Sequence, residues 1–242
     1  MKITQYKAIQ ENTRVALVFD VETNGLINSK KANQPLETFP YVLQISYAMY
    51  DLTNNCLVKT VDSYIKVPDH VVISPETTNI NGISKDLCLS KGVPICEVLC
   101  EFYADYHQSD ILVAHNFKFD AMFIDAEFNR NWDTLRLICP YSLNLFHQTY
   151  MTQLGIQYKC TMADSTDICK LPSKRKPFPG KEATFKWPTL TELHNFLFQE
   201  IPRGMHNSMM DVLVTLRCFV MLESGLKLEQ EQMKEIEQNV FA

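Results

Sequence analysis

The sequence has no excess of positive charge, no hydrophobic run long enough to cross a membrane, no internal repeat and no low-complexity tract. It carries 23 lysine and arginine residues against 28 aspartate and glutamate residues, which gives a net charge of −5. This balance argues against a protein that binds nucleic acid through bulk positive charge. It still allows an enzyme with a local basic path and an acidic site that cations neutralise.

Paired cysteine motifs are also missing. None of the 8 cysteines belongs to a C-x-x-C pair. Cys96 and Cys100 lie four residues apart in a helical pattern, which favours two packed thiols over a metal site. The first residues contain no apolar stretch of the kind found in signal peptides. We therefore expect an intracellular, soluble protein with reduced thiols, cytoplasmic by default and without a membrane partner. The basic run "SKRKP" is too short to indicate a nuclear signal.

The length and composition favour one folded domain. The chain has 242 residues, of which 46% are hydrophobic, and no convincing domain boundary. We expect a single domain over 1–242, with a helical insertion at about 131–156 and a basic surface segment at about 170–188.

Hydrophobic patterns predict an α/β fold with a mixed sheet. Short apolar or alternating runs indicate strands at 15–21, 41–51, 56–68 and 111–115, and 158–162 is a further candidate. The two runs at 41–68 read as a hairpin, and 74–88 reads as turn-rich because it contains proline, asparagine and glycine. Helices are expected at 93–107, 116–130, 189–198, 208–223 and 226–241.

Two carboxylates stand at the end of the first apolar run, "LVFDVETNGL". Asp20 and Glu22 are two residues apart, so on a strand their side chains share one face and can converge on one cation. The alternative is a strand end that emerges into solvent. Asp125 and Glu127 have the same spacing in a helical pattern, where they diverge by about 200°. We interpret these two as solvated helix charges.

Two further segments carry candidate groups. Asp120 follows the strand at 111–115 in the first turn of a helix, where the helix dipole favours a carboxylate, although an ordinary first-turn aspartate is the alternative. In "MHNSMMD", a helix capped by Asn207 or Ser208 would leave His206 in the preceding loop, able to lean over the same end as Asp211. The alternative for His206 is a surface histidine.

Taken together, "FDVETNGL", "AHNFKFD" and "HNSMMD" resemble the three motifs of the DEDDh 3′→5′ exonucleases, the group that includes the proofreading epsilon subunit of bacterial DNA polymerase. "SPETTNINGIS" resembles the stretch between the first and second motifs, and the resemblance runs from about 15 to 222. It implies an RNase H-like fold: a mixed five-stranded sheet, with a three-stranded antiparallel meander plus parallel strands, flanked by helices.

The resemblance also implies a mechanism and its cofactors. Two divalent cations, Mg²⁺ or Mn²⁺, would be held by four carboxylates. Asp20 would bridge both ions, Glu22 and Asp211 would complete one shell, and Asp120 would act on the second ion directly or through water. His206 would be the general base, because imidazole titrates close to neutral pH. The implied reaction is hydrolysis of DNA or RNA from a 3′ end to nucleoside 5′-monophosphates, with single strands as the expected substrate and with repair and proofreading among the implied roles.

Substrate contacts follow from the same resemblance. Leu26 could wedge against the terminal base, or simply pack in the core. Glu76 would lie near the terminal sugar and Asn81 near its phosphate side, although both could be turn-forming residues. Asn116 could hold the loop before Asp120 or only cap the helix.

The basic segment mixes cationic and aromatic residues, which suits single-stranded nucleic acid, although a solvated loop with a packed tryptophan is the alternative. The residues concerned are Lys170, Lys174, Arg175, Lys176, Lys181, Lys186, Phe178, Phe185 and Trp187.

Two other functions are compatible with the motifs. The same fold could serve as a catalytically silent nucleic-acid-binding or processivity module, and clustered aspartates also occur in other metal-dependent enzymes such as phosphatases. The presence of all four carboxylates and the histidine favours the enzyme. The sequence makes no choice between DNA and RNA, and it does not indicate protein partners or an oligomeric state.

Overall fold

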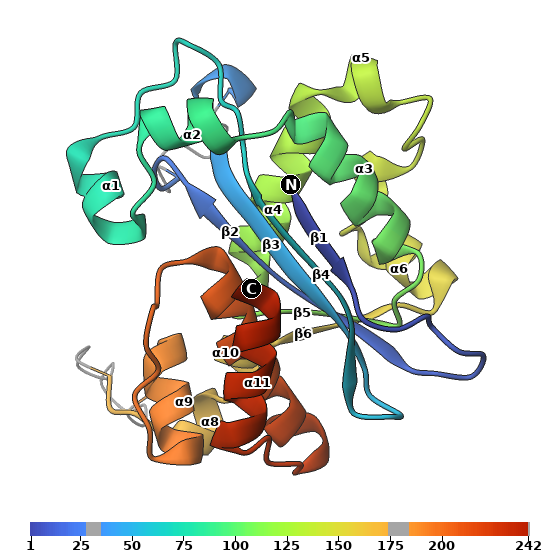
Figure 1. The fold of residues 1–242 in the computed structure, drawn as a ribbon, viewed down its shortest axis with the longest axis vertical. Helices are drawn as coiled ribbons and strands as arrows, with labels where there is room; N and C mark the ends of the chain where they lie inside the picture. Colours follow the sequence, from blue (N-terminus) through green and yellow to red (C-terminus); the bar gives the residue numbers. More distant parts are fainter. Residues whose placement is uncertain (28–34, 174–183, 242) are drawn as a thin grey trace.

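A six-stranded mixed sheet forms the centre of the computed structural model, which describes residues 1–27, 35–173 and 184–241 (Figure 1). The strand order is β1-β4-β3-β2-β5-β6. The pairs β1–β4, β4–β3 and β3–β2 are antiparallel, whereas β5 runs parallel to β2 and β6 parallel to β5. The strands are β1 (Lys2–Gln5), β2 (Val15–Thr23), β3 (Val42–Asp51), β4 (Cys56–Tyr64), β5 (Ile111–Ala114) and β6 (Gln157–Cys160).

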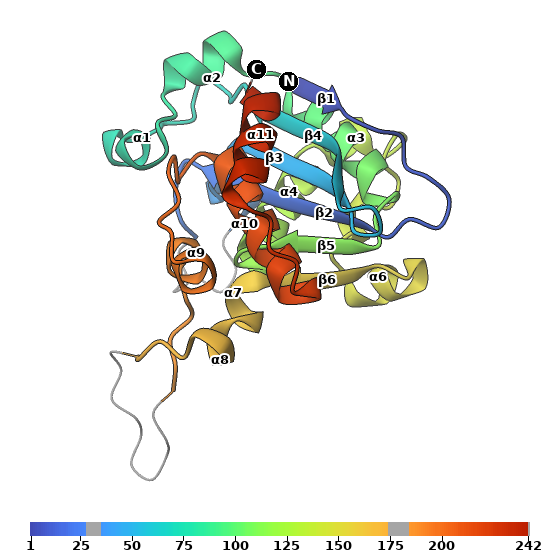
Figure 2. The same cartoon turned by 60° about the horizontal axis from the view of Figure 1, so that its bottom comes forward.

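Helices cover both faces of the sheet, as Figures 1 and 2 show. The α-helices are α1 (Pro75–Asn81), α2 (Lys85–Lys91), α3 (Ile95–Tyr106), α4 (Phe117–Arg130), α5 (Trp132–Leu135), α6 (Gln148–Leu154), α7 (Thr161–Asp164), α8 (Thr166–Cys169), α9 (Leu190–Phe198), α10 (Ser208–Ser224) and α11 (Gln230–Phe241). Two 3₁₀ helices are η1 (Leu36–Thr38) and η2 (Ser142–Asn144). None of the helices in the described parts of the chain is long and apolar enough to span a bilayer.

The alternation of side chains along β2 sets up the site. Leu17 and Phe19 belong to the core cluster shared with α3 and α4, whereas Ala16 and Val18 belong to the cluster shared with α10 and α11. Because side chains two residues apart share a face, Asp20 and Glu22 continue the α10 side of the strand. The last two carboxylates of this central strand therefore point toward α10. The sheet and its covering helices confirm the predicted α/β fold with a mixed sheet.

The sheet has one strand more than the five expected. β1 pairs with β4 at the edge of the sheet, from Lys2 opposite Asp62 to Gln5 opposite Lys59. Its four residues, "KITQ", are mostly exposed, so they give no apolar run that a pattern search would detect. Backbone pairing, rather than burial, makes this segment a strand.

The segment 74–88, expected to be turn-rich, forms the two short helices α1 and α2 instead. Ser74 and Ser84 each accept a backbone hydrogen bond at 3.1 Å, from Thr77 and Leu87 respectively, and so cap the two helices. Gly82 ends α1 with a positive φ of 73°. The residues that suggested turns are therefore helix caps. The segment 131–156 contains three short helical elements, α5, η2 and α6.

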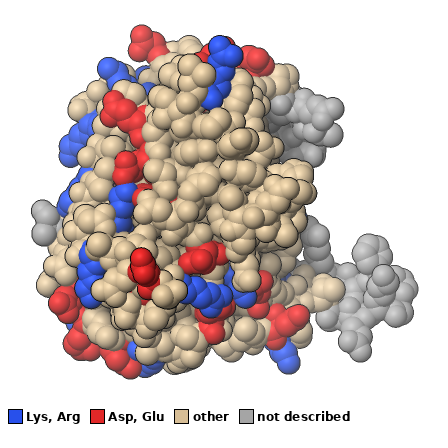
Figure 3. Space-filling view, turned by 90° about the vertical axis from the view of Figure 1, so that its right-hand side faces the viewer, with Lys and Arg blue, Asp and Glu red and all other residues tan. Residues whose placement is uncertain are grey.

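Charged side chains are dispersed over one side of the molecule. Figure 3 views the right-hand side of Figure 1, where α3, α5 and α6 lie, and uncharged side chains make up most of that face. Leu137 and Ile138, between α5 and η2, are 87% and 63% exposed. On this face cationic and acidic residues are intermixed and form no broad basic patch, in keeping with the overall negative charge.

Candidate active site

Three carboxylates from distant parts of the chain meet at the end of β2. Asp20, Glu22 and Asp211 each offer an oxygen atom, and these atoms all lie within 4.8 Å of one another. Asp20 and Glu22 reach this point because they share the α10 face of β2. Asp211 reaches it from the first turn of α10, whose length packs against the same face of the sheet.

Polar side chains fix the start of α10 against the sheet. The Ser208 hydroxyl donates to the carbonyl oxygen of Asp20 at 2.7 Å, and the Ser208 amide donates to Gln44 Oε1 at 3.4 Å. Gln44 is fully buried on β3, opposite Glu22 in the sheet register, and it donates to Asp62 at 2.8 Å. Asn207 caps the helix by accepting a hydrogen bond from the Met210 amide. The position of Asp211 thus depends on residues that contact β2 and β3.

Asp120 approaches the cluster from α4 and is held by the backbone. It is buried, and its Oδ1 accepts a hydrogen bond of 3.1 Å from the Val21 amide, between the two carboxylates of β2. Asp120 is not part of the three-oxygen group, but its charge is the strongest electrostatic influence on Asp20 after burial itself. The structure therefore places it beside Asp20, as its motif predicted.

Burial and mutual repulsion disfavour the charged forms of these acids. Burial, together with the nearby Asp211 charge, raises the pKa of Glu22 to about 7, and burial raises the pKa of Asp211 to about 7. The pKa of Asp20 is raised well above its ordinary value by burial, with contributions from Asp120, Asp211 and Glu22. Such shifts are typical of a site that requires a counter-charge.

Two oxygens of the cluster have no internal partner. Asp20 Oδ2 and Asp211 Oδ1 are buried and accept no hydrogen bond from any described residue. An unsatisfied buried carboxylate oxygen is costly, and a hard divalent cation is the ligand that would satisfy it. The donor set, all carboxylate oxygens, fits Mg²⁺ or Mn²⁺.

His206 lies next to the cluster in the loop before α10, as the capping argument predicted. Asn207 is the N-cap, and the His206 backbone amide donates to Asp211 Oδ2 at 3.2 Å. His206 is exposed and has a positive φ of 66°. A left-handed backbone at a residue other than glycine is uncommon and marks a turn that its surroundings enforce.

The residues expected to contact substrate occupy different environments. Leu26 is 79% exposed, so the alternative of core packing is wrong for it. Glu76 is exposed in the first turn of α1. Asn81 is buried; its Oδ1 accepts from the Ile83 amide at 3.0 Å, and its side-chain hydrogen bond to Glu22 lowers the pKa of that acid. Asn81 thus supports Glu22 directly.

Asn116 differs from the expected helix cap. It occupies the N-cap position of α4, yet its side chain makes no capping hydrogen bond, and its φ is 75°. The expectation that its side chain caps the helix is therefore wrong. Its role is a left-handed turn that joins β5 to α4, a conformation that asparagine tolerates better than most residues.

The basic segment is only partly described. Lys174, Arg175, Lys176, Phe178 and Lys181 lie outside the described residues. Of the remainder, Lys186 forms an ion pair with Glu192, whereas Trp187 is 66% exposed and so is not the packed tryptophan of the alternative interpretation.

One interpretation of the charges on α4 is wrong. Glu127 is buried, accepts a hydrogen bond from the Val42 amide at 3.1 Å and pairs with Arg130, so it is not a solvated helix charge. Gln44 and Ser208 were not predicted as supports of the site. A lone glutamine inside the apolar run "YVLQISYAMYD" was the available signal for Gln44, because a buried polar side chain needs a partner.

A mixed sheet that gathers carboxylates at the end of its central strand is an arrangement suited to cleaving phosphoester bonds. A family model described as "Exonuclease" (RNase_T) matches residues 17–219. The chain therefore belongs to this exonuclease family, which confirms the resemblance to the DEDDh 3′→5′ exonucleases.

Individual relatives match either over part of this chain or over most of it at low sequence identity. A DNA polymerase III of the PolC type from Streptococcus mutans is 34% identical over 120 residues, which is 50% of this chain and 7% of the polymerase. E. coli Exonuclease I in complex with a dT13 oligonucleotide superposes with a TM-score of 0.63 at 15% identity, over 94% of this chain and 43% of that one. A zinc-bound form of the E. coli ExoI–ssDNA complex gives a TM-score of 0.61 at 16% identity, over 93% of this chain and 43% of that one. The chain thus spans less than half of each of these proteins, and the structural likeness concerns the fold.

Proposed function

We propose that this chain is a metal-dependent 3′→5′ exonuclease that acts on single-stranded nucleic acid and releases nucleoside 5′-monophosphates. The observation that carries the proposal is the convergence of Asp20, Glu22 and Asp211, two of which retain a buried, unpartnered oxygen in the described structure. Family membership supports hydrolysis of phosphodiester bonds. The oligonucleotide in the Exonuclease I complex and the polymerase relative both support a DNA substrate.

Each acid has a distinct place in the proposed reaction. Asp20, Glu22 and Asp211, with Asp120 beside them, would hold the divalent cations. Bound cations would stabilise charge on the attacking and leaving oxygens. His206 would accept a proton from the attacking water, since it lies on the loop whose backbone already contacts Asp211.

The proposed substrate contacts lie around the same end of β2. Leu26 follows the strand with its side chain exposed, which would allow it to wedge against the terminal base. Glu76, exposed at the start of α1, would face the terminal sugar. Asn81 would act mainly by orienting Glu22, because its side chain is already engaged with that acid and with Ile83.

Degradation of labelled oligonucleotides tests the proposal. Single-stranded DNA, single-stranded RNA and duplex DNA, each labelled at the 5′ end, are incubated with Mg²⁺ or Mn²⁺. We expect a ladder that shortens from the 3′ end and mononucleotide 5′-phosphates as products, with single-stranded DNA cut fastest.

Matched variants complete this test. Asp20→Asn should remove most activity, whereas Asp86→Asn, an exposed acid on α2, should retain it. Binding of single strands without cleavage would instead indicate a silent binding module. Cleavage inside the strand or from the 5′ end would contradict the proposal.

A further inference from the structure

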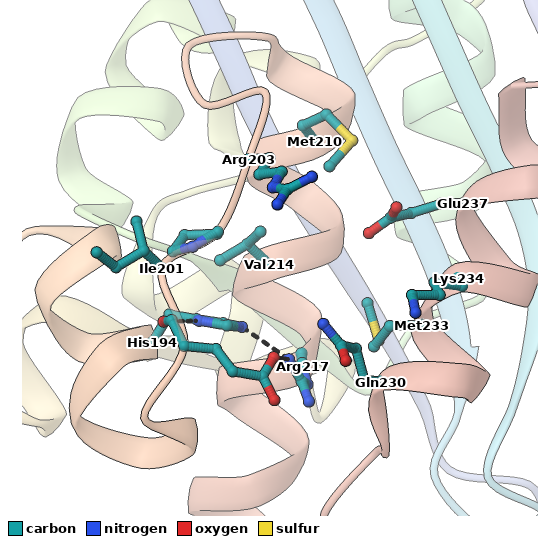
Figure 4. A pocket seen from close by; sticks show the side chains of 12 residues that line it. His194, Ile201, Arg203, Met210, Val214, Arg217, Gln230, Met233, Lys234 and Glu237 are labelled. Carbon is teal, nitrogen blue, oxygen red and sulfur yellow. Dashed lines mark hydrogen bonds and ion pairs between the residues drawn. The ribbon is translucent and has the colours of Figure 1, made fainter.

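A cavity of about 470 Å³ lies between α9, the segment 200–203, α10 and α11 (Figure 4). None of the four site carboxylates lines it, but Met210, the residue before Asp211, does. Ile201 and Arg203 also line it, and they belong to the segment that leads to His206. The cavity is therefore separate from the candidate active site and is adjacent to it at Met210.

A buried cation forms part of the cavity wall. The Arg217 side chain is 4% exposed and lies over the ring of Phe198. Its Nη1 donates to Glu200 at 2.9 Å and to His194 Nε2 at 3.0 Å, and its Nε donates to the Leu228 carbonyl at 2.9 Å. Nη2 is buried and has no partner among the described residues. A buried guanidinium with an unused donor is costly unless an acceptor completes it.

The charges around Arg217 favour an anion. Arg203 and Lys234 line the cavity and form no ion pair with any described residue. Two acids also line it, Glu237 and Glu200, and the latter is already paired with Arg217. The lining therefore carries one more positive than negative charge. His194 adds none, because burial lowers its pKa and its Nε2 accepts from Arg217.

We propose that this cavity binds a phosphomonoester of mononucleotide size, with the phosphate between Arg203, Lys234 and Arg217. Guanidinium groups bind phosphate oxygens through paired hydrogen bonds. The volume lies within the range of small-molecule sites, and Ile201, Val214 and Met233 supply apolar walls for the nucleoside. A phosphate oxygen reaches Arg217 when Glu200, whose side chain is 34% exposed, rotates away. The ligand thus replaces an internal carboxylate.

Because the ligand displaces Glu200 from Arg217, the variant Glu200→Gln is diagnostic for the proposal. Calorimetric titration of dAMP into the wild-type chain, with EDTA present so that no cation bridges dAMP to the acid cluster, should show saturable binding. Arg203→Ala and Lys234→Ala should each weaken binding about tenfold, as expected for loss of a charge-assisted hydrogen bond. Glu200→Gln should strengthen binding several-fold because it weakens the internal competitor.

Controls separate this site from others. Lys91→Ala, an exposed lysine at the end of α2, and Asp20→Asn, in the acid cluster, should both bind dAMP like the wild type. Thermal melts show whether each variant folds. Absence of dAMP binding, weaker binding in Glu200→Gln, or unchanged binding in Arg203→Ala and Lys234→Ala would overturn the proposal. Inorganic phosphate that binds as tightly as dAMP would overturn the nucleoside part of it. These outcomes hold whether or not the chain degrades nucleic acid.

Discussion

The Ser208 hydroxyl donates a hydrogen bond of 2.7 Å to the carbonyl oxygen of Asp20. This bond joins the first residue of α10 to β2, at the point where both elements present carboxylates to the same cluster. The separation of Asp20 and Asp211 therefore depends on the uncharged side chain of Ser208, which links the two elements that carry them.

Ser208→Ala should lower activity more than it lowers stability. Loss of one buried hydrogen bond costs about 1 kcal/mol of unfolding free energy. A displaced helix start shifts Asp211 and His206, and small misplacements of reacting groups can reduce rates by up to about 100-fold. Steady-state kinetics and urea denaturation measure the two effects.

Ser224 provides a matched control at the other end of α10, where its hydroxyl donates to the Val220 carbonyl at 2.8 Å. Ser224→Ala should change stability modestly and leave activity intact. Ser208→Thr, which retains the hydroxyl, should recover part of the lost rate. Equal rates in Ser208→Ala and the wild type would show that the bond does not position the site.

The core of the site was predictable from sequence because strand geometry and capping rules act locally. Side-chain alternation placed Asp20 and Glu22 on one face, and the Asn207 cap placed His206 in a loop. The supports of the site were not predictable. The partners of Gln44 lie 18 and 164 residues away, in Asp62 and Ser208, and no local pattern encodes such pairings.

The same limit explains why some secondary-structure elements were predicted wrongly. β1 is a strand only because β4 offers it an edge, and α1 and α2 form because Ser74 and Ser84 cap helices in a segment rich in turn-forming residues. Propensity is a weak guide where a tertiary partner or a cap supplies the missing stabilisation.

Without metal, the acid cluster should destabilise the chain as pH rises. Burial raises the pKa of Glu22 and of Asp211 to about 7, whereas both acids titrate near 4 in an unfolded chain. The folded state therefore holds these protons more tightly than the unfolded state. The stability that this provides is fully present below about pH 4 and is lost as pH rises through about 7.

Thermal melting in EDTA between pH 5 and 8 checks this expectation. Relative to the wild type, Glu22→Gln should show a shallower decline of the melting temperature with pH, and Glu231→Gln, an exposed glutamate on α11, should not. Mn²⁺ should raise the melting temperature more at pH 8 than at pH 5, because protonated carboxylates bind metal poorly. Parallel curves for the wild type and Glu22→Gln would contradict the prediction.

His206→Asn should remove activity without unfolding the protein. The backbone of residue 206 is left-handed with φ of 66°, and asparagine tolerates that conformation. The side chain is exposed, and the hydrogen bond to Asp211 comes from the backbone amide, which the substitution retains. Loss of a positioned general base should reduce the rate by about 10²- to 10⁴-fold.

Metal affinity distinguishes a base from a structural residue in this variant. If His206 accepts the proton, His206→Asn should lower the rate of cleavage while the affinity for Mn²⁺ is unchanged. His107→Asn, a change at an exposed histidine after α3, should keep both the rate and the Mn²⁺ affinity. A His206→Asn variant with the wild-type rate would rule out the assigned role.

Glu127 should contribute to stability and not to catalysis, in contrast to the acids at the end of β2. It pairs with Arg130 and accepts the Val42 amide, so it joins α4 to β3, and Arg130 in turn donates to the Phe39 carbonyl at 2.8 Å. Removing one member of a buried ion pair typically costs about 3–5 kcal/mol. Glu127→Gln can still accept the Val42 hydrogen bond, so we expect a loss of about 2–4 kcal/mol in urea denaturation.

Asp125 is the matched control for this change, because it lies two residues earlier on the same helix and carries the same charge. It is only partly buried, and burial raises its pKa, so its charged form is disfavoured in the folded state. Asp125→Asn should therefore leave stability unchanged or slightly higher. Both variants should keep wild-type activity per folded molecule. If Glu127→Gln were as stable as Asp125→Asn, then Arg130 would hold the 36–40 segment through its carbonyl contacts alone, and the ion pair would not be what fastens α4 to the sheet.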